Sequence, residues 1–197
     1  MKFNLLLIVK SLLAACLCIH TFGCGSGAAN GSTASSVELA TVSGSDQFLL
    51  MSDAGADGGM LPVEYTCDGS GSSPALSWSQ PPEGTKEFAL MMTTLPGDGT
   101  TKWNWVVYGI PASVTGLSKN NTTVGITGTG SHGTSMIYDG PCSQGPGAKL
   151  YTFTIYALSA SPALPSSADL VTGPILTSAI SSVTLGSAAL NLSYSRP

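Results

Sequence analysis

The sequence predicts one mainly β domain of the β-sandwich type, and three observations support this prediction. Short apolar or alternating runs follow one another from about residue 46 to the end of the chain. Segments that favour turns and stop helices separate these runs, among them Pro96-Gly97-Asp98-Gly99. Segments with a helical pattern are scarce. A chain of 197 residues is long enough for one ordinary domain and too short for two once an export segment is removed.

The first 24 residues have the pattern of a bacterial lipoprotein signal peptide. Two apolar stretches follow a positively charged start, and Lys10 interrupts them. A transmembrane helix would need about 20 apolar residues without such a break. Cleavage is expected before Cys24, which would then carry the lipid, because a segment of Gly, Ser, Ala and Asn begins directly after it. Cys16 is the alternative lipidation site, since residues 13–15 fit the usual cleavage motif better. A signal peptide cut without lipid is a further alternative.

Residues 25–45 are predicted to be a flexible tether. They are mostly Gly, Ala, Ser, Thr and Asn with few apolar side chains, so burial cannot repay the entropy lost on ordering them. The tether leads into the folded domain, residues 46–197. We therefore expect the protein in the cell envelope, anchored by its lipid on the periplasmic face or the cell surface, or secreted if it is not lipidated.

Six segments of the domain have the pattern of strands. They are residues 48–51, 75–78, 88–92, 103–110, 151–158 and 189–194. In the fourth, regular alternation would place Trp103, Trp105 and Val107 on one face and Asn104, Val106 and Tyr108 on the other. The fifth alternates at first and then turns apolar on both faces, which predicts a central strand that is buried on both sides at its end.

Only two segments are candidate helices, residues 167–176 and residues 178–185. Gly173-Pro174 is expected to cut the first of them, because proline has no backbone N–H and clashes with the preceding turn inside a helix. The sequence therefore predicts little helix in this domain.

Charged side chains are rare and of mixed sign. Asp, Glu, Lys and Arg make up 9% of the chain, against about a quarter in an average soluble domain. The formal net charge is -4, and the seven Lys and Arg residues form no cluster. The electrostatic footprint of a nucleic-acid-binding protein is absent, which excludes nucleic acid as an expected partner.

Cys67 and Cys142 are the two cysteines of the predicted folded domain. In an oxidising compartment outside the cytoplasm they can form a disulfide. Two buried free thiols are the alternative. A zinc site is disfavoured, because two thiols without a nearby pair of histidine ligands cannot complete a tetrahedral shell. No metal and no cofactor are expected.

The sequence does not predict an enzyme. His132 is the only histidine after the signal peptide, and it lies in the glycine-flanked segment 130–133. No Gly-x-Ser-x-Gly nucleophile motif accompanies it. We interpret such a histidine as a solvated loop residue rather than as a catalytic base.

Several linked motifs of the domain occur together and in one order. They are Leu61-Pro62-Val63-Glu64-Tyr65-Thr66-Cys67-Asp68-Gly69, Ser73-Pro74-Ala75-Leu76-Ser77-Trp78, Pro82-Glu83-Gly84-Thr85-Lys86, Trp105-Val106-Val107-Tyr108-Gly109-Ile110-Pro111, Tyr138-Asp139-Gly140-Pro141-Cys142, residues 151–158 and Tyr194-Ser195-Arg196. In these motifs the chain resembles the phosphatidylethanolamine-binding protein family, in its bacterial Raf-kinase-inhibitor-like branch. The resemblance implies a β-sandwich of two antiparallel sheets with a few short peripheral helices.

The resemblance also implies a small surface pocket that holds an anion, usually a phosphate-like group. The family forms it from an Asp-Pro-Asp-Ala-Pro stretch, a His before a strand Trp, a Gly-Pro loop and a Gly-x-His-Arg-Tyr segment. At the corresponding places this chain has Thr93 to Gly97 without carboxylates, Asn104 before Trp105, Gly140 and Pro141, and Lys149-Leu150-Tyr151. The expected ligand-binding residues are therefore Asn104, Gly140, Pro141, Lys149 and Tyr151. Asn104 and Lys149 can alternatively be an ordinary strand residue and an exposed lysine.

Two functions from different classes follow from this pattern. The first is a membrane-tethered binding protein that holds a small anionic or phosphate-bearing ligand in a degenerate pocket. The second is a protein-interaction or inhibitor module whose pocket no longer binds anions and whose partner is another envelope protein. Contact with the membrane is expected through the lipid anchor alone. An exported domain cannot meet a cytoplasmic kinase, so the name of the family branch gives no partner.

Overall fold

The computed structural model describes residues 47–133, 136–144 and 146–196. The predicted signal peptide, both candidate lipidation sites (Cys24 and Cys16) and the predicted tether lie outside the described residues, so these assignments stay predictions. Within the described part of the chain, no helix is long and apolar enough to cross a membrane.

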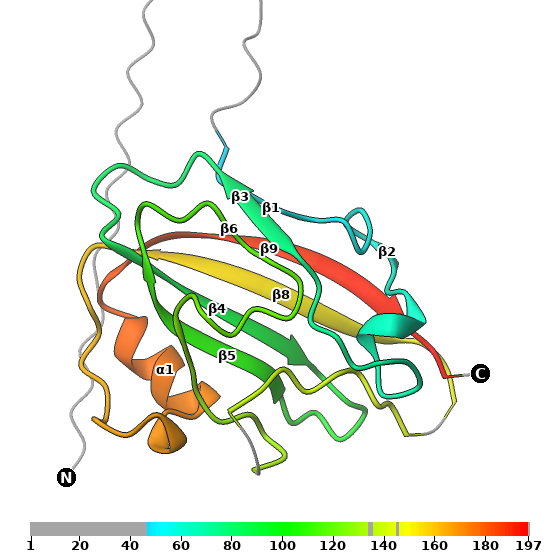
Figure 1. The fold of residues 1–197 in the computed structure, drawn as a ribbon. Helices are drawn as coiled ribbons and strands as arrows, with labels where there is room; N and C mark the ends of the chain where they lie inside the picture. The colour runs from blue at the N-terminus through cyan, green and yellow to red at the C-terminus, as the bar shows by residue number, and fades with distance from the viewer. Residues whose placement is uncertain (1–46, 134–135, 145, 197) are drawn as a thin grey trace, which may run out of the picture. The chain divides into compact units, whose positions relative to one another are not determined.

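Two β-sheets pack against each other to form the fold (Figure 1). The larger sheet has six strands in the order β2 (Gly59–Met60), β9 (Thr184–Tyr194), β8 (Lys149–Leu158), β4 (Glu87–Thr94), β5 (Lys102–Pro111) and β7 (Ile126–Thr127). The smaller sheet has the order β1 (Leu49–Ser52), β3 (Leu76–Ser79) and β6 (Gly116–Leu117). The mainly β prediction is confirmed. The pairing differs from the expectation at one place, because β2 runs parallel to β9.

The main hydrophobic core fills the space between the two sheets. The smaller sheet contributes Leu50, Leu76, Trp78 and Leu117, and the facing side of the larger sheet contributes Phe88, Leu90, Met92, Trp105, Val107, Tyr151, Phe153, Ile155, Leu190 and Leu192. The rings of Trp78 and Phe88 meet edge to face, with their centroids 5.3 Å apart. Burial of this apolar surface is what holds the two layers together.

The other face of the larger sheet is covered by the segment that contains α1 (Gly173–Ile180) (Figure 1). A second cluster packs there and includes Ala89, Met91, Val106, Tyr108, Leu158, Val171, Leu176 and Ile180. The larger sheet is therefore buried on both sides. This confirms the prediction for β8, which lies between β9 and β4 and ends in two fully buried residues, Ala157 and Leu158.

The helices differ from the prediction in position. The structure has α1, and two short 3₁₀ helices, η1 (Val63–Tyr65) and η2 (Ala168–Leu170). Gly173-Pro174 does not cut a helix but begins α1, because a proline in the first turn loses no hydrogen bond there. The predicted helix 178–185 is wrong beyond Ile180, since a turn follows and β9 starts at Thr184. Pairing of β9 with β8 overrides the weak helical pattern there.

Strand β5 does not alternate regularly, and the prediction for its first residues was wrong. Met92 pairs with Trp105 whereas Thr93 pairs with Trp103, so Asn104 is an extra residue in β5. This bulge turns Trp103 to the α1 side of the sheet instead of the side of Trp105. Gly173 packs directly on the Trp103 ring, where a Cβ atom would lie 2.1 Å from a ring carbon.

Candidate functional site

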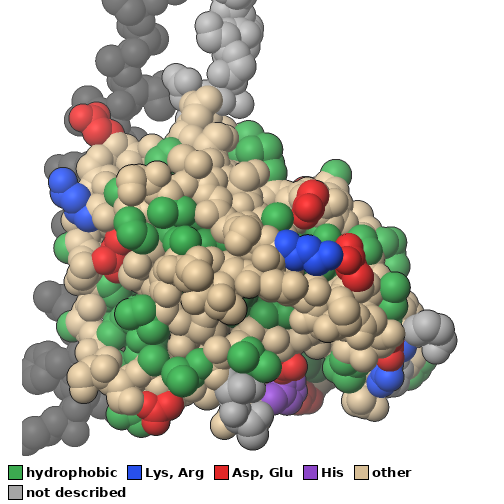
Figure 2. All heavy atoms as spheres, viewed as in Figure 1, with side chains coloured by type: hydrophobic (Ala, Val, Ile, Leu, Met, Phe, Trp, Pro, Cys, Tyr) green, Lys and Arg blue, Asp and Glu red, His purple; other side chains and the backbone are tan. Residues whose placement is uncertain are grey.

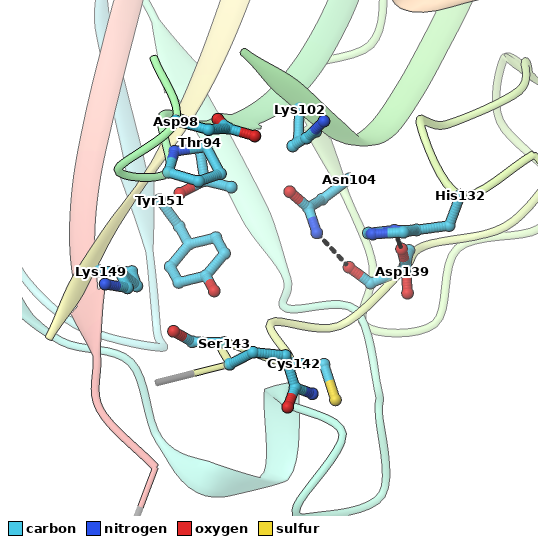
Figure 3. Close-up of a pocket in the computed structure, with 12 residues that line it drawn as sticks. Thr94, Asp98, Lys102, Asn104, His132, Asp139, Cys142, Ser143, Lys149 and Tyr151 are labelled. Carbon is cyan, nitrogen blue, oxygen red and sulfur yellow. Dashed lines mark hydrogen bonds and ion pairs between the residues drawn. The ribbon is translucent and has the colours of Figure 1, made fainter. Parts of the chain in front are cut away.

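A pocket lies at one end of the larger sheet, where β4 ends and where β5 and β8 begin (Figure 3). Its volume is about 480 Å³, which is in the range of small-molecule sites. The strand ends contribute Thr94, Lys102, Asn104, Lys149 and Tyr151, the turn after β4 contributes Pro96 and Asp98, and the loop before β8 contributes His132, Asp139, Cys142, Ser143 and Gln144. Charged side chains are otherwise sparse and scattered on the face shown in Figure 2.

The structure places three of the five predicted ligand-binding residues in the pocket wall, namely Asn104, Lys149 and Tyr151. Gly140 and Pro141 lie just behind the wall, between the lining residues Asp139 and Cys142. A Cβ at Gly140 would come within 3.2 Å of the Thr66 backbone, and the Pro141 carbonyl accepts a hydrogen bond from the Cys67 N–H at 3.1 Å. These two residues position the loop. Ligand binding by all five stays a prediction.

Asn104 is the most deeply placed of these residues, with 3% of its surface exposed. Its Nδ2 donates to the Asp139 carbonyl oxygen at 3.1 Å, and the Asp139 N–H donates to the Asn104 carbonyl at 2.8 Å. The bulge of β5 thereby connects the strand to the loop before β8. Asn104 Oδ1 is buried and has no hydrogen-bond partner among the described residues.

Two further groups of the pocket carry hydroxyls. Ser143 is 8% exposed, and its Oγ is also buried without a partner in the described part of the chain. Burial raises the pKa of the Tyr151 phenol, with nearby Asp139 adding to the effect, so this hydroxyl stays neutral and able to donate. Tyr138, in the same loop as Ser143, is likewise kept neutral because burial raises its pKa, and its hydroxyl donates to the Tyr65 carbonyl at 2.8 Å.

Sequence reasoning missed several pocket residues, and His132 is the clearest case. Its side chain is 66% exposed, as expected of a loop residue, but its ring lines the pocket and its Nδ1 hydrogen-bonds Asp139 Oδ2. Asp98 was missed too, although it follows directly after the segment that lacks the family's carboxylates. Ser143 directly follows Cys142, and its position beside the recognised Gly140-Pro141-Cys142 motif could have indicated that it lies near the pocket.

The charges of the pocket are mixed. Lys102 and Lys149 are positive, Asp98 and Asp139 are negative, and His132 adds a positive charge when it is protonated. This pattern differs from a purely basic anion site. It suits a ligand that carries hydrogen-bond donors together with an anionic group.

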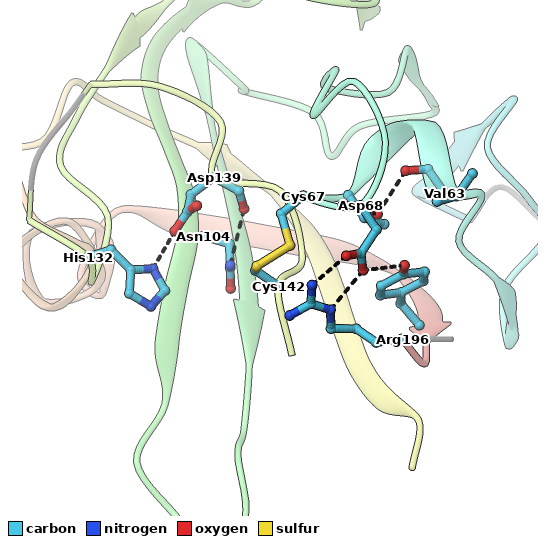
Figure 4. Close-up of a disulfide and its surroundings, with 10 residues drawn as sticks. Val63, Cys67, Asp68, Asn104, His132, Asp139, Cys142 and Arg196 are labelled. Carbon is cyan, nitrogen blue, oxygen red and sulfur yellow. Dashed lines mark hydrogen bonds and ion pairs between the residues drawn. A yellow bond between two sulfur atoms is a disulfide. The ribbon is translucent and has the colours of Figure 1, made fainter. Parts of the chain in front are cut away.

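A disulfide between Cys67 and Cys142 borders the pocket (Figure 4). The predicted pairing is confirmed, and the Cα atoms of the two residues are 5.3 Å apart. Beside it, Asp68 accepts hydrogen bonds from the Tyr194 hydroxyl at 2.7 Å and from Arg196 Nη2 at 2.6 Å. The disulfide and this ion pair connect the segment after η1 to the pocket loop and to the end of β9.

A two-layer β-sandwich with one helix over the outer face of its larger sheet, and with a polar pocket at the strand ends, is the architecture that the resemblance to the phosphatidylethanolamine-binding class implies. The sequence comparison agrees, since the family model described as phosphatidylethanolamine-binding protein matches residues 51–195. The chain therefore belongs to the phosphatidylethanolamine-binding protein family.

Solved structures show the same fold. A phosphatidylethanolamine-binding protein homologue, CT736 of Chlamydia trachomatis, superposes with a TM-score of 0.70 at 26% identity, over 78% of this chain and 100% of its own. YbcL of Escherichia coli, described as a member of the mammalian family, superposes with a TM-score of 0.68 at 25% identity, over 76% of this chain and 99% of its own.

Two sequence relatives come from bacteria. A UPF0098 protein of Aquifex aeolicus is 38% identical over 112 residues, which are 52% of this chain and 63% of the relative. A protein of Mycobacterium tuberculosis whose name places it among the lipoproteins, LppC, is 33% identical over 136 residues, which are 68% of this chain and 66% of the relative. The matches thus span about two thirds of the relatives' own lengths.

Proposed function

We propose that this protein is a non-enzymatic binding protein that holds a small anionic, polar ligand in the pocket at the ends of β4, β5 and β8. One observation carries the proposal: Asn104 and Ser143 each keep a buried polar atom without a partner in the described residues, and both line this pocket. Buried polar atoms in folded proteins are nearly always hydrogen-bonded. A ligand that hydrogen-bonds to Asn104 Oδ1 and to Ser143 Oγ would give each of these buried atoms a partner.

The anionic part of the ligand is assigned to the lysines. Lys102 from the start of β5 and Lys149 from the start of β8 line the pocket, and the Tyr151 and Ser143 hydroxyls add neutral donors. Ammonium groups and hydroxyls are the side-chain donors that hold phosphate and carboxylate oxygens. The family name of this chain supports a phosphate-bearing ligand.

The pocket chemistry supports binding rather than catalysis. The His132–Asp139 pair has the form of a base with its orienting carboxylate. A nucleophile next to the base is missing from the described side chains, since none of their hydroxyls hydrogen-bonds the His132 ring and Cys142 is held in the disulfide. We therefore assign His132 and Asp139 to the shaping of the pocket rim.

We place the protein in the cell envelope, anchored by a lipid on Cys24. The support is the similarity to LppC, which is named a lipoprotein, and the composition break after Cys24. Intact-mass measurement of protein extracted from membranes should show acylated Cys24 as the first residue. Acylation of Cys16 instead, or a soluble form without lipid, would contradict this assignment.

Calorimetric titration of the full-length chain with phosphate and phosphoethanolamine tests the binding function. Binding at millimolar ligand is expected, and Lys149→Gln and Lys102→Gln should each weaken it by about tenfold, the loss of one charged hydrogen bond. Lys86→Gln is the matched control, because Lys86 precedes β4 at the opposite end of that strand from the pocket. No binding of either ligand at millimolar concentration would refute the proposal and favour an interaction module whose pocket is unused.

A further inference from the structure

We infer that the inner end of this pocket receives a hydrogen-bond donor of the ligand, an N–H or O–H group, and not its anionic oxygens. The inference rests on the proposed function, because it concerns the orientation and chemical class of the ligand in the same pocket. The ligand class is a small anion that also carries an amino or hydroxyl donor.

The orientation of the Asn104 amide is set by its hydrogen-bond partner in the loop. A backbone carbonyl can only accept a hydrogen bond, so the Asn104 atom that faces the Asp139 carbonyl must be the Nδ2 donor. The other terminal atom, Oδ1, is thereby fixed as the one that remains for the pocket (Figure 3). An amide oxygen accepts hydrogen bonds and repels the oxygens of a phosphate or carboxylate.

Because Asn104 Oδ1 is buried, leaving it without a hydrogen bond costs free energy. Asn104 is 3% exposed, and its Oδ1 is closed off from solvent and lacks a partner in the described part of the chain. An acceptor left in that state costs free energy, and a ligand donor that reaches it removes the cost. A ligand that offers only oxygens at this position keeps the cost and adds repulsion.

The charges around this end are mixed, because Lys102 lies beside Asn104 in the pocket together with groups that can accept from a ligand donor (Figure 3). The carboxylates of Asp98 and Asp139 line the same pocket, and Ser143 Oγ can accept as well as donate. In Figure 3 the Tyr151 ring lies between the Asn104 and Lys149 side chains. A ligand that reaches both must therefore extend along this ring, with its anionic group toward Lys149 and its donor toward Asn104.

This arrangement reverses the polarity that the family resemblance implies at this position. The resemblance predicts a histidine there, which donates to an anion. Asn104 keeps the position but turns its donor away to the loop, so that an acceptor remains. With Asn104 in place of the family's histidine, the inner end of the pocket therefore binds a hydrogen-bond donor of the ligand instead of an anionic oxygen.

A series of ligands that differ only at the amine tests this inference by calorimetry on the full-length chain. The three probes are phosphoethanolamine, its N,N-dimethyl derivative and phosphocholine. The dimethyl compound has nearly the bulk of phosphocholine but keeps one N–H, whereas phosphocholine has none. We expect the first two to bind with similar affinity and phosphocholine to bind about tenfold more weakly, the effect of one buried acceptor left unpaired.

Two further arms identify the source of the donor. sn-Glycerol 3-phosphate offers hydroxyls in place of the amine, and binding in the range of phosphoethanolamine would show that either donor serves. Vesicles of phosphatidylethanolamine, with phosphatidylcholine vesicles as the control, present the same amine on a lipid. Preference for phosphatidylethanolamine vesicles over phosphatidylcholine vesicles supports the inference, and equal binding of the two kinds of vesicle opposes it.

Asn104→Leu provides the residue-level test, because leucine has a similar size and no acceptor. In this variant the three amine ligands should bind alike, whereas Lys86→Gln should keep the discrimination of the unchanged protein. Circular dichroism would verify that the leucine variant is folded. If this variant does not fold, the ligand series on the unchanged protein still tests the inference. Equal binding of the dimethyl compound and phosphocholine to the unchanged protein overturns the inference while leaving the proposed function intact. Failure of every probe to bind overturns both.

Discussion

Asp68 connects the end of the chain to the loop beside the pocket. Its carboxylate accepts hydrogen bonds from the Tyr194 hydroxyl and from two guanidinium nitrogens of Arg196, Nε at 3.0 Å and Nη2 at 2.6 Å. A carboxylate held by a two-pronged guanidinium contact is among the stronger arrangements of this kind at a surface. The Arg196 hydrogen bonds, with the Tyr194 hydroxyl second, lower the pKa of Asp68 below its usual range.

Replacement of Asp68 by Asn should reduce stability in a pH-dependent way. Because the folded-state pKa is lowered, the stabilising contribution is complete above the unfolded-state pKa, about 3.9 for an aspartate. It is lost as the pH falls through the lower, folded-state pKa. The difference in unfolding free energy between the native protein and Asp68→Asn should therefore be largest near neutrality and shrink below about pH 4. Urea unfolding between pH 2.5 and pH 7 measures this difference.

Tyr194→Phe serves as the matched variant for this pH series, since it removes one donor to Asp68 and leaves the charge pair intact. Its effect should have the same sign and a smaller size. A difference for Asp68→Asn that stays constant over the whole pH range would show that the carboxylate contributes through packing and not through its charge.

At the scale of one element, strand β5 shows that its sequence pattern predicts the extent of the strand but not its bulges. Its extent was predicted well, as residues 103–110 against the observed Lys102–Pro111. Its two irregularities were not. One is the bulge at Asn104, and the other lies between the pairs Phe88–Ile110 and Leu90–Val107, where β5 again has one extra residue. A bulge depends on pairing with the neighbouring strand, and alternation within one strand cannot reveal it.

The second bulge contains Gly109, whose φ of +64° is the left-handed conformation. Gly109→Ala should destabilise the fold by about 1 kcal/mol, because a side chain in this conformation meets its own backbone. Crowding by neighbours does not contribute, since a Cβ there would have no described atom within 4 Å. Chemical denaturation measures the change. Gly109→Asn should cost less, as asparagine tolerates this conformation better, and equal losses for Ala and Asn would argue against backbone strain as the cause.

At the scale of the whole molecule, the layers were predictable and the pocket only in part. Alternation and turn chemistry identified the main strands, because burial of one face imposes a period of two. The family resemblance named Asn104, Lys149 and Tyr151 together, and all three line the pocket, whereas ligand binding by them stays a prediction. It could not place Asp98 or His132, which reach the pocket from turns and loops whose path depends on tertiary contacts. It also could not give the direction of the Asn104 amide, which a single carbonyl of the loop determines.

The disulfide cross-links the segment after η1 to the pocket loop, and its removal should affect both stability and binding. It closes a loop between residues 75 positions apart, which contains the five strands β3 to β7. The double variant Cys67→Ser/Cys142→Ser should lose about 4 kcal/mol of unfolding free energy, because the unfolded chain regains the conformations that the cross-link excluded. Denaturant unfolding measures this loss.

The same double variant should also bind phosphoethanolamine more weakly under conditions in which it remains folded. Cys142 and Ser143 both line the pocket, and the cross-link holds this wall against the segment after η1. Binding is measured by calorimetry well below the denaturation midpoint, with the reduced native chain as a second sample that carries no substitution. Unchanged affinity in both samples, together with the expected loss of stability, would show that the Cys67 N–H to Pro141 carbonyl bond and the Asn104–Asp139 pair suffice to hold the pocket loop in place.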